Sequence, residues 1–414
     1  MSFAWSASTV LIGIAWTTLL LWLVAALLTW RGLHRRPLLL LALPSDDELK
    51  GDDAPLVSIL VPARNEERRV LAAAVRSMLA QDYERLEFVA VDDRSIDATG
   101  AILKSLAAID PRLRVLDGVE PPDGWLGKPH AMWQALANSR GEWVLATDAD
   151  MIFEPQLVRA AVSRARAGGF DALTLIPRVE CLTFWERVFM PTFGWFVSMS
   201  RPVERVNDPR RPESIGIGGF FLMRRARLEA VGGYEAVAGE VAEDLRLAEL
   251  LKKSGARLRV EHAPQLLRTR MQPNLRGIWE GFTKNLFAGA KFSAVRGIAG
   301  LLGLLLFHIA PLPVALWCGL MWWATGTTTG GMWWPHLLVP CALIWLTQVL
   351  TFMLINRGAG VPLRYALTVP LGIALFAAIL LNSMLKILSG QGVMWKGRKL
   401  YARGSGAVAR MKNE

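Results

Sequence analysis

The stretch Trp143-Val-Leu-Ala-Thr-Asp-Ala-Asp150 joins a short apolar run to two carboxylates that are one residue apart. An apolar run of this length predicts a buried strand, and the acidic residues lie where that strand stops. Two earlier apolar runs end in a similar way, and the residues that follow them are Arg64, Asn65 and Glu66 in one case and Asp92 and Asp93 in the other. Because ligands of open α/β sheets bind outside the carboxyl ends of the strands, these endings predict one ligand site.

Around these endings the chain alternates between short β-branched runs and amphipathic stretches. This alternation predicts an α/β fold with a mostly parallel sheet covered by helices. The expected strands are residues 57–61, 86–91, 113–116 and 143–147. The expected helices are residues 66–79, 95–108 with a cap at Ser95, 127–139 and 240–253.

The 414 residues are too apolar for an evenly composed soluble fold, since 52% are hydrophobic and 17 are Trp. Residues 10–30 form an apolar run long enough to cross a hydrocarbon layer of about 30 Å. No Lys or Arg precedes this run, whereas Arg31, His34, Arg35 and Arg36 follow it. This order favours a retained anchor over a cleaved signal peptide, and the positive-inside rule then places the following residues in the cytoplasm.

Three further apolar runs, at residues 297–324, 337–355 and 365–387, are also long enough to span a membrane. An odd number of spans after a cytoplasmic domain would leave the basic tail outside, against the positive-inside tendency. We therefore expect a hairpin or a re-entrant segment in the first of these runs, which contains two prolines, or in the last, which contains Pro370 and Gly372.

The net charge of +11 does not by itself indicate a nucleic-acid partner, because the basic residues gather beside the apolar runs, at 31–36 and 386–412. Attraction to anionic lipid headgroups explains this placement. Cys181, Cys318 and Cys341 predict neither a disulfide framework nor a zinc site, since two of them lie inside apolar runs. We expect an integral inner-membrane protein with its catalytic domain in the reducing cytoplasm.

One aromatic segment lies within the strand-rich region, and a second lies between that region and the C-terminal apolar runs. Residues 184–200 are interpreted either as a core helix or as a segment in the bilayer interface. Residues 268–296 are basic and aromatic, which is typical of a bridge at the membrane surface. The expected organisation is an anchor with its basic flank at 1–36, a linker at 37–54, a catalytic domain at 55–267, an interfacial segment at 268–296, apolar spans at 297–390 and a basic tail at 391–414.

The acidic endings have specific chemical uses. Asp92 and Asp93 can accept hydrogen bonds from a base or a ribose hydroxyl, although a capped turn with solvated acids would contain the same residues. Asp97 fits that role or the dipole of the following helix. Asp148 and Asp150 can hold Mg²⁺ or Mn²⁺ against a diphosphate, and the alternative is a surface acidic turn.

A second acidic pair and a lysine complete the candidate site. Glu243 and Asp244 begin a helix, where acids commonly complement the helix dipole. Asp244 is also suited to take the proton of an acceptor hydroxyl as a general base. Lys128 follows a Gly-containing turn and can bind a diphosphate as a point charge, while Trp125 in that turn can pack on a sugar or a base.

Together these motifs resemble the family 2 glycosyltransferases of GT-A fold over residues 55–268. The motifs occur in the family's order, as Val61-Pro-Ala-Arg-Asn-Glu66, Asp92-Asp93, Gly124-Trp-Leu-Gly-Lys128, Thr147-Asp-Ala-Asp150, Gly218-Gly219-Phe220, Gly232-Gly233-Tyr234 and Glu243-Asp244-Leu245. Within the family, the anchor, the Trp-Leu-Gly-Lys loop, the C-terminal apolar runs and the closing Val393-Met-Trp-Lys-Gly-Arg398 are similar to ceramide glucosyltransferases and to hopanoid- or carotenoid-associated glycosyltransferases.

The resemblance implies an inverting transfer of a hexose from a nucleoside-diphosphate sugar, with UDP as the expected nucleotide and GDP as the other option. It implies that Asp150 holds the divalent metal with help from Asp148, and that Asp244 acts as the base beside Glu243. The implied residues on the nucleotide-sugar side are Pro62, Arg64, Glu66, Asp92, Asp93, Lys128 and Asp148. The implied acceptor-side residues are Trp125, Gly219, Gln272, Arg276 and Trp279. For Trp279, anchoring at the membrane interface is the other interpretation.

The expected acceptor is a membrane lipid whose hydroxyl reaches the site at the cytoplasmic face. Processive members of the family often carry Gln-x-x-Arg-Trp near the acceptor channel, whereas this chain has Gln272-Pro-Asn-Leu-Arg276-Gly-Ile-Trp279. The longer spacing and the small number of spans argue against a polysaccharide synthase, which stays as the first alternative. The second alternative is an inactive membrane protein that keeps the fold.

Overall fold

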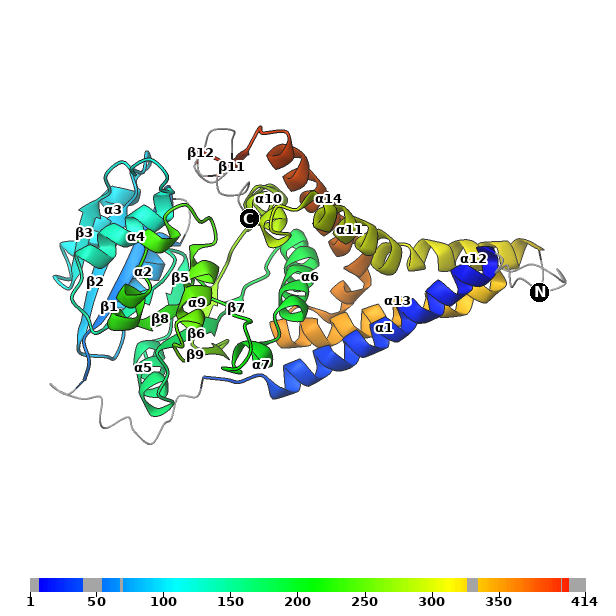
Figure 1. The fold of residues 1–414 in the computed structure, drawn as a ribbon, viewed down its shortest axis with the longest axis horizontal. Coiled ribbons are helices and arrows are strands. Elements are labelled where there is room, and N and C mark those ends of the chain that lie inside the picture. The colour runs from blue at the N-terminus through cyan, green and yellow to red at the C-terminus, as the bar shows by residue number, and fades with distance from the viewer. Residues whose placement is uncertain (1–6, 40–53, 68–69, 326–333, 396, 402–414) are drawn as a thin grey trace. The chain divides into compact units, whose positions relative to one another are not determined.

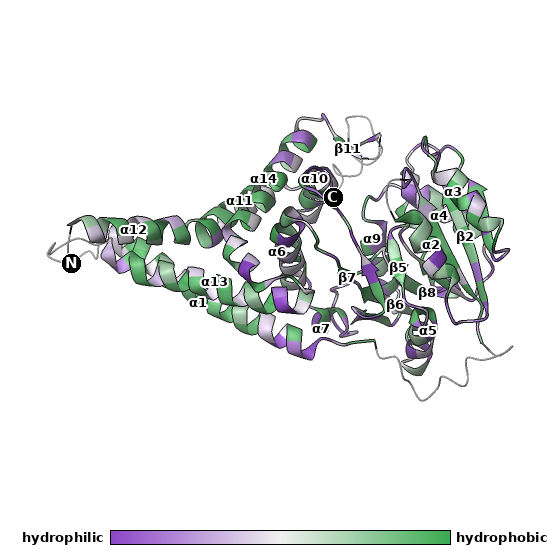
Figure 2. Cartoon of the chain, turned by 180° about the vertical axis from the view of Figure 1, so that it is seen from behind, coloured by the Kyte–Doolittle hydropathy of each residue, from purple (hydrophilic) through white to green (hydrophobic). Residues whose placement is uncertain are grey.

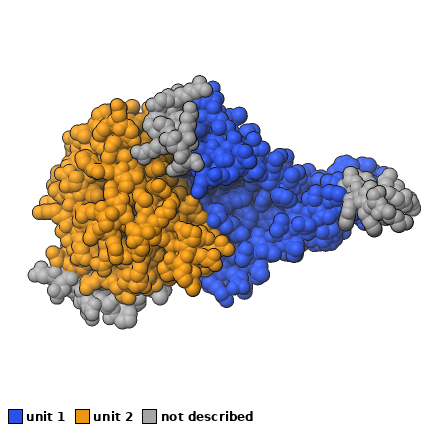
Figure 3. Space-filling view, in the orientation of Figure 1, with its two compact units in different colours: residues 1–35, 181–200, 272–393 blue, residues 36–180, 201–271, 394–414 orange. Residues whose placement is uncertain are grey.

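The computed structural model describes residues 7–39, 54–67, 70–325, 334–395 and 397–401 (Figure 1). The chain folds into two compact units, each built from segments that are far apart in the sequence (Figure 3). The helical unit combines Met1–Arg35, Cys181–Ser200 and Gln272–Val393, and the sheet unit combines Arg36–Glu180, Arg201–Met271 and Met394–Glu414. A segment of the helical unit thus interrupts the sheet unit, and the chain returns to the sheet unit after residue 393.

The sheet unit contains a seven-stranded sheet with the strand order β3-β2-β1-β4-β8-β6-β9. These strands are β1 (Val57–Ala63), β2 (Leu86–Asp92), β3 (Leu113–Asp117), β4 (Trp143–Ala146), β6 (Ala172–Ile176), β8 (Phe221–Arg224) and β9 (Leu258–His262). Strand β1 runs parallel to β2 and β4, β2 runs parallel to β3, and β9 runs parallel to β6. Only β8 is antiparallel to its neighbours within this sheet, so the expected mostly parallel α/β sheet is confirmed.

Helices cover both faces of this sheet because its central strands are apolar on both sides. Ile59 and Leu60 are adjacent in β1, point to opposite faces and are both fully buried. One face packs against α2 (Leu71–Leu79), α3 (Thr99–Ala107) and α5 (Leu157–Ala167). The other face packs against α4 (Gly127–Ala137), α8 (Arg225–Ala230) and α9 (Glu243–Lys253). The helices expected at 127–139 and 240–253 are α4 and α9, and each is shorter than expected at one end.

The helix expected at 66–79 begins at Leu71 instead of Glu66. The backbone N–H of Glu66 donates to Thr99 Oγ1 at 2.7 Å, and that of Glu67 donates to Asp97 Oδ2 at 3.1 Å. Side chains of the loop before α3 therefore bind the amides that open this segment. Local side-chain bonds of this kind compete with helix formation, which explains the later start of α2.

The expected cap at Ser95 is also wrong, because α3 begins at Thr99. The Ser95 hydroxyl accepts a hydrogen bond from the Asn65 N–H at 3.1 Å, and the Ser95 N–H donates to Asp92 Oδ1 at 3.1 Å. Asp97 Oδ1 instead accepts from the Thr99 N–H at 3.0 Å. Of the two roles left open for Asp97, this contact favours the local one at the start of α3.

Smaller elements complete the sheet unit. A three-stranded sheet has the order β5 (Met151–Phe153), β10 (Leu267–Thr269) and β7 (Arg178–Val179). A two-stranded sheet joins β11 (Val393–Trp395) to β12 (Arg398–Leu400) near the C-terminus. Two short helices are α7 (Val203–Val206) and η3 (Glu235–Val237).

The helical unit contains the apolar runs. Its elements are α1 (Ala7–Arg35), α6 (Phe184–Ser200), α10 (Leu275–Gly289), α11 (Ala294–Gly303), η4 (Leu304–Ile309), α12 (Pro311–Thr325), α13 (Pro335–Ala359), η5 (Leu363–Thr368) and α14 (Val369–Leu388). Within the described residues, four helical segments are long and apolar enough to cross a membrane, namely Ser8–Arg35, Ala294–Thr325, Pro335–Ala359 and Leu363–Leu388. Figure 2 shows hydrophobic residues along most of α1, α12 and α13.

The apolar runs at 297–324 and 365–387, one of which was expected to form a hairpin, are both continuous helical segments. A π-helical turn precedes Pro311, and Pro370 lies in the first turn of α14, where the lost N–H is tolerated. The hairpin interpretation is therefore wrong, and the re-entrant alternative stays a prediction.

Helix α6 packs inside the helical unit. Trp195 Nε1 donates to Thr29 Oγ1 at 2.9 Å, and the Trp195 ring stacks on Trp22 with 5.1 Å between centroids. Phe189 is fully buried. These contacts favour the core-helix interpretation of residues 184–200.

Candidate active site

The carboxyl ends of β1, β2 and β4 lie side by side because these strands are parallel neighbours. Ala63 at the end of β1 pairs in register with Asp92 at the end of β2. The polar residues that follow these strands, Arg64, Asp93 and Asp148, therefore lie at the same edge of the sheet. This is the edge of an α/β sheet where ligands bind.

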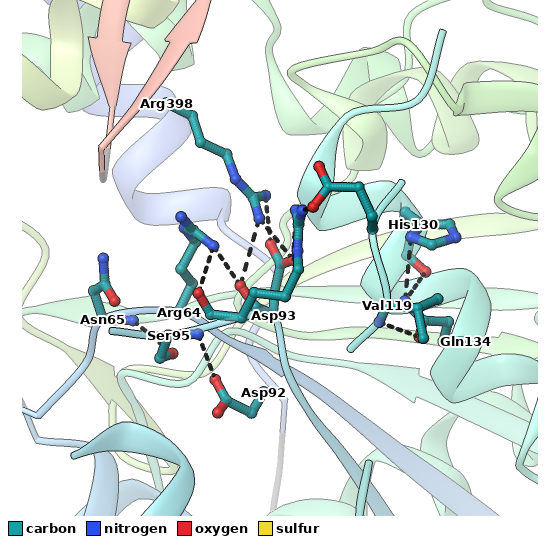
Figure 4. Close-up of polar contacts among 11 residues, drawn as sticks. Arg64, Asn65, Asp92, Asp93, Ser95, Val119, His130, Gln134 and Arg398 are labelled. Carbon is teal, nitrogen blue, oxygen red and sulfur yellow. Dashed lines mark hydrogen bonds and ion pairs between the residues drawn. The ribbon is translucent and has the colours of Figure 1, made fainter. Parts of the chain in front are cut away.

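Asp93 is the centre of an arginine cluster formed by Arg64, Arg94 and Arg398 (Figure 4). Arg398 binds the Asp93 carboxylate through both terminal nitrogens, with Nη1 2.7 Å from Oδ2 and Nη2 2.9 Å from Oδ1. Arg94 Nη2 lies 3.3 Å from the same Oδ1, while Arg64 donates to the backbone oxygens of Asp93 and Arg94. The Asp93 side chain is only 8% exposed, so arginines rather than water balance its charge.

The backbone around Asp93 is shaped for close contact. A Cβ added at Gly127 would lie 1.6 Å from Arg398 Nη1 and 2.7 Å from Asp93 Oδ2, so the ion pair packs directly on this glycine. Asn65 and Arg94 have positive φ angles of 51° and 55°, which non-glycine residues adopt infrequently. Backbone strain of this kind gathers at ligand sites.

Asp92 has a different role from its neighbour. Its Oδ1 accepts the Ser95 N–H at 3.1 Å, and a Cβ added at Gly100 would lie 2.4 Å from its Oδ2. In Figure 4 the Asp92 carboxylate points away from Asp93 and toward Ser95. Asp92 therefore supports the loop before α3, whereas Asp93 faces the arginines.

Lys128 is the centre of an acidic cluster formed by Asp148, Glu243 and Asp244. Its Nζ lies 2.8 Å from Asp148 Oδ1 and 2.7 Å from Glu243 Oε1. Burial opposes the charge of Lys128, but the surrounding carboxylates, Asp148 first, outweigh it and raise the pKa of the lysine well above its ordinary value. The pKa of Glu243 is raised by burial, because its side chain is only 6% exposed, and Lys128 opposes that rise.

Asp244 is held by two backbone amides. Its Oδ2 accepts the Gly218 N–H at 2.7 Å, and its Oδ1 accepts the Leu245 N–H at 2.8 Å. A Cβ added at Gly218 would lie 3.0 Å from Lys128 Nζ and 3.2 Å from Asp244 Oδ2, so a larger residue would press on both groups. The glycine-rich segment before β8 thus fixes the direction of the Asp244 carboxylate.

A small cavity of about 10 Å³ opens between these groups and is lined by Lys128, Glu243, Asp244 and Tyr234 among others. Tyr234 is 1% exposed, and its hydroxyl has no hydrogen-bond partner within the described part of the chain. Burial raises the pKa of this hydroxyl, so it stays protonated at neutral pH. Tyr234 therefore places a neutral O–H beside the acidic cluster.

The carboxylates after β4 are the candidate ligands of a metal ion. Among the described residues, no group of three or more His, Cys, Asp or Glu side chains is arranged to hold a metal. Asp148 and Asp150 lie one residue apart at the strand end, and the Asp148 side chain is 40% exposed. Two carboxylates suit a hard cation that takes its other ligands from water and substrate phosphates. The residues present therefore fit a metal held jointly with a diphosphate.

Residues 58–232 match the model of glycosyl transferase family 2. By this match the segment is similar to family 2 glycosyltransferases, and we call it the glycosyltransferase domain. A relative with 24% identity over 237 residues is 4,4'-diaponeurosporenoate glycosyltransferase from Staphylococcus aureus, and the match covers 56% of this chain and 61% of the relative. The chain thus spans about three fifths of the length of the curated relatives that it matches.

A similar solved structure is a mannosyltransferase from Pyrobaculum calidifontis in complex with GDP-mannose and Mn²⁺. The TM-score is 0.52 and the sequence identity is 21%, with 91% of this chain and 99% of that chain covered. This likeness confirms the GT-A fold of the glycosyltransferase domain. It also confirms the fold expected from the sequence motifs.

The remaining predicted residues divide between the two units. In the glycosyltransferase domain, Glu66 is buried at 5% exposure, Pro62 lies in β1, and the Gly219 oxygen accepts the Thr147 hydroxyl at 2.8 Å. The helical unit contains the other acceptor-side candidates, which are Gln272, Arg276 and Trp279. Arg276 is 87% exposed and pairs with Glu280 on α10 at 2.8 Å, which is an ordinary surface contact.

Trp125 lines a hollow of about 440 Å³ on the glycosyltransferase domain, together with His130 and Trp133. The rings of His130 and Trp133 stack 5.7 Å apart, and Trp125 meets both edge-on. Trp133 Nε1 donates to Glu235 Oε1 at 3.0 Å. Burial lowers the pKa of His130, so the ring is neutral at pH 7. The hollow is therefore an aromatic surface close to Lys128 in the chain.

Sequence reasoning did not identify Arg398 or Tyr234 as site residues. Arg398 is 305 positions from Asp93, and its only sequence signal was its place in the closing motif at 393–398. Tyr234 carried a comparable signal as the last residue of Gly232-Gly233-Tyr234.

Proposed function

We propose that this protein is an inverting glycosyltransferase that transfers a hexose from a nucleoside-diphosphate sugar to a lipid hydroxyl at the cytoplasmic membrane face. The observation that carries the proposal is the fixed Asp244 carboxylate beside Lys128, at the carboxyl edge of a GT-A sheet. The carotenoid glycosyltransferase activity named for the relatives and the GDP-mannose bound by the similar structure support the two substrate classes.

In the proposed reaction, Asp244 takes the proton of the acceptor hydroxyl while that oxygen forms a bond to the anomeric carbon. The bond between the anomeric carbon and the diphosphate oxygen breaks, and its electron pair leaves with the nucleoside diphosphate. The amides of Gly218 and Leu245 hold Asp244 in one direction, which supports its role as a positioned base. Asp244 lies among other acidic groups, and Glu243 is kept in a pair with Lys128.

The leaving diphosphate requires cationic partners. The raised pKa of Lys128 keeps its amine positively charged at neutral pH. Because the side chain is 39% exposed, it can contact a phosphate oxygen as well as its carboxylate partners. Asp148 and Asp150 would hold a divalent cation, which neutralises charge on the diphosphate when bound. Asp93, Arg64, Glu66 and Pro62 stay the proposed contacts of the nucleoside side, with Asp92 supporting their loop.

The acceptor is proposed to be a lipid because four apolar helices accompany the domain and a basic flank follows the first. The aromatic hollow supports an acceptor role for Trp125, since aromatic faces pack well on sugars and on apolar chains. Gly219 and the α10 residues Gln272, Arg276 and Trp279 stay predictions for the acceptor side. The same charge pattern supports the proposal that the protein lies in the inner membrane with its domain in the cytoplasm.

The test is transfer of radiolabelled sugar from UDP-sugars and GDP-sugars in membranes that contain wild type or Asp244→Asn. We expect label in extractable lipid from the wild type and a loss of about 100-fold or more in the variant. Asn is similar in size and keeps an oxygen that accepts the Gly218 N–H, so the fold should survive. Asp208→Asn is the matched control, because Asp208 pairs with Arg210 elsewhere in the sheet unit.

Three results would contradict the proposal. Label in a high-mass polymer would favour a polysaccharide synthase, and wild-type turnover by Asp244→Asn would exclude Asp244 as the base. If no sugar is incorporated from either nucleotide class, the chain is an inactive protein that keeps the fold.

A further inference from the structure

Strands β11 and β12 form a short hairpin, called the C-terminal hairpin. It supplies a side chain to the edge of the seven-stranded sheet where the nucleotide is proposed to bind. Helix α14 ends at Leu388, and residues after Val393 belong to the sheet unit. Tyr401, directly after β12, is 4% exposed, so the end of the hairpin is anchored by burial. Arg398 on β12 thereby reaches Asp93 (Figure 4).

Arg398 lies between the two halves of the proposed nucleotide-sugar site. Its guanidinium binds Asp93, and it packs on Gly127, the residue directly before Lys128. Asp93 belongs to the proposed nucleoside side, and Lys128 belongs to the proposed diphosphate side. A group at this position is therefore within reach of the part of a nucleotide that joins the base and ribose to the phosphates.

The chemistry of the cluster favours an anion. Three arginines contact the single buried carboxylate of Asp93, through its side chain or its backbone. The pKa of Arg64 is lowered by burial and by the charge of Arg398, which shows that positive charge is crowded here. A guanidinium has five N–H donors in a planar fork that matches a phosphate as well as a carboxylate. Phosphate oxygens would offer these guanidinium groups a second set of anionic acceptors beside Asp93.

We propose that Arg398 is a binding residue for the diphosphate of the nucleotide sugar, and that it exchanges the Asp93 carboxylate for phosphate oxygens when the nucleotide binds. The exchange releases Asp93 to accept hydrogen bonds from the base or the ribose. This inference rests on the proposed function and names the residue that joins the two halves of its site. The C-terminal hairpin is then one wall of the nucleotide site and does more than anchor the chain.

The experiment compares the binding of UDP, GDP, uridine and guanosine to the full-length protein in detergent by isothermal titration calorimetry. The variants are Arg398→Ala and Arg398→Lys, with Arg210→Ala as the control because Arg210 is an 88% exposed arginine paired with a single aspartate. We expect Arg398→Ala to weaken the binding of the nucleoside diphosphate by about 10- to 100-fold and the binding of the matching nucleoside by less than about threefold. Arg398→Lys should fall between, because it keeps the charge and loses the fork.

Two other affinity patterns overturn the proposal. If Arg398→Ala binds the diphosphate as the wild type does, Arg398 serves the hairpin only. If nucleoside and nucleoside diphosphate weaken equally, Arg398 acts by positioning Asp93. If Arg398→Ala fails to fold in a thermal melt, Arg398→Lys decides by the same ratio of the two affinities. A wild type that binds neither UDP nor GDP removes the proposed function itself, which distinguishes the two failures.

Discussion

The two ends of the candidate site have opposite charge arrangements. At the end of β2, three arginines surround one aspartate, whereas at the end of β4 three carboxylates surround one lysine. Strands β2 and β4 both run parallel to β1, which lies between them in one sheet, so the difference comes from the loops and not from the sheet. An excess of guanidinium favours an anion, and an excess of carboxylate favours a cation or a proton.

The difference indicates how one edge of a sheet can bind a substrate whose parts require groups of opposite charge. In the proposed reaction, cationic groups bind the phosphates of the nucleotide sugar, while the acceptor hydroxyl loses its proton to a base. In the proposed site, Arg398 and Lys128 are the cationic groups, and Asp244 is the base. The following changes test whether the contrast has this meaning.

The largest expected effect is that of metal removal at the acidic cluster. Chelation with EDTA should lower sugar transfer by about 100-fold or more, because the diphosphate loses its divalent partner, and Mn²⁺ should restore it. Asp150→Asn should raise the Mn²⁺ concentration needed for half of the activity, whereas Asp208→Asn should overlay the wild type. Full sugar transfer in metal-free buffer would mean that the reaction does not depend on a cation bound at this acidic cluster.

A smaller effect is expected when Lys128 is replaced by Met. Turnover should fall by about 10- to 100-fold through loss of the charge near the diphosphate. The unfolding free energy should fall by about 2 kcal/mol, a value reduced from that of a fully buried pair because Lys128 is 39% exposed.

This loss of stability should depend on pH. The pKa of Glu243 is raised in the folded protein, and without Lys128 it rises further. A raised carboxyl pKa gives stability that is present below the unfolded value and is lost as pH rises through the folded value. The melting temperature of Lys128→Met should therefore fall further below that of wild type at pH 8 than at pH 5. Lys104→Met, which breaks only the exposed pair with Asp117, should show no such trend.

The smallest expected effect is that of Arg94→Gln in the arginine cluster. Arg94 contacts Asp93 at 3.3 Å and pairs with Glu120, whose side chain is 81% exposed. Exposed pairs contribute little, so the KM for the nucleotide sugar should rise by less than about threefold. An effect as large as that of Arg398→Ala would mean that the cluster acts through total charge and not through the Arg398 fork.

The fold and much of the acidic cluster could be predicted because both depend on local patterns. Strand β2 ends at Asp92 and β4 ends two residues before Asp148, as apolar runs followed by carboxylates predict. The acidic pair at the start of α9 is typical of a helix N-terminus. The start of α2 could not be predicted in this way, because the amide of Glu66 is bound by Thr99 from another loop. Local propensity carries no information on such contacts.

The arginine cluster was the less predictable half for the same reason. Arg64 was recognised from its motif, but Arg398 reaches Asp93 across 305 positions. The positive φ angles of Asn65 and Arg94 have no signal in residue type comparable to a glycine. Such a pairing follows from the tertiary fold, after the hairpin has been placed in the sheet unit.

The late position of Arg398 has a consequence for biosynthesis. A ribosome makes residues in order, at about 5 to 20 per second, so Asp93 emerges long before its ion-pair partner. Of the four apolar helical segments in the described part of the chain, one is translated before Asp93 and three are translated between Asp93 and Arg398. The Asp93 carboxylate therefore waits without Arg398 until the last helix has been made. A chain released before residue 398 would lack this contact, so the proposed nucleotide site is complete only after the apolar helical segments up to Leu388 have been made.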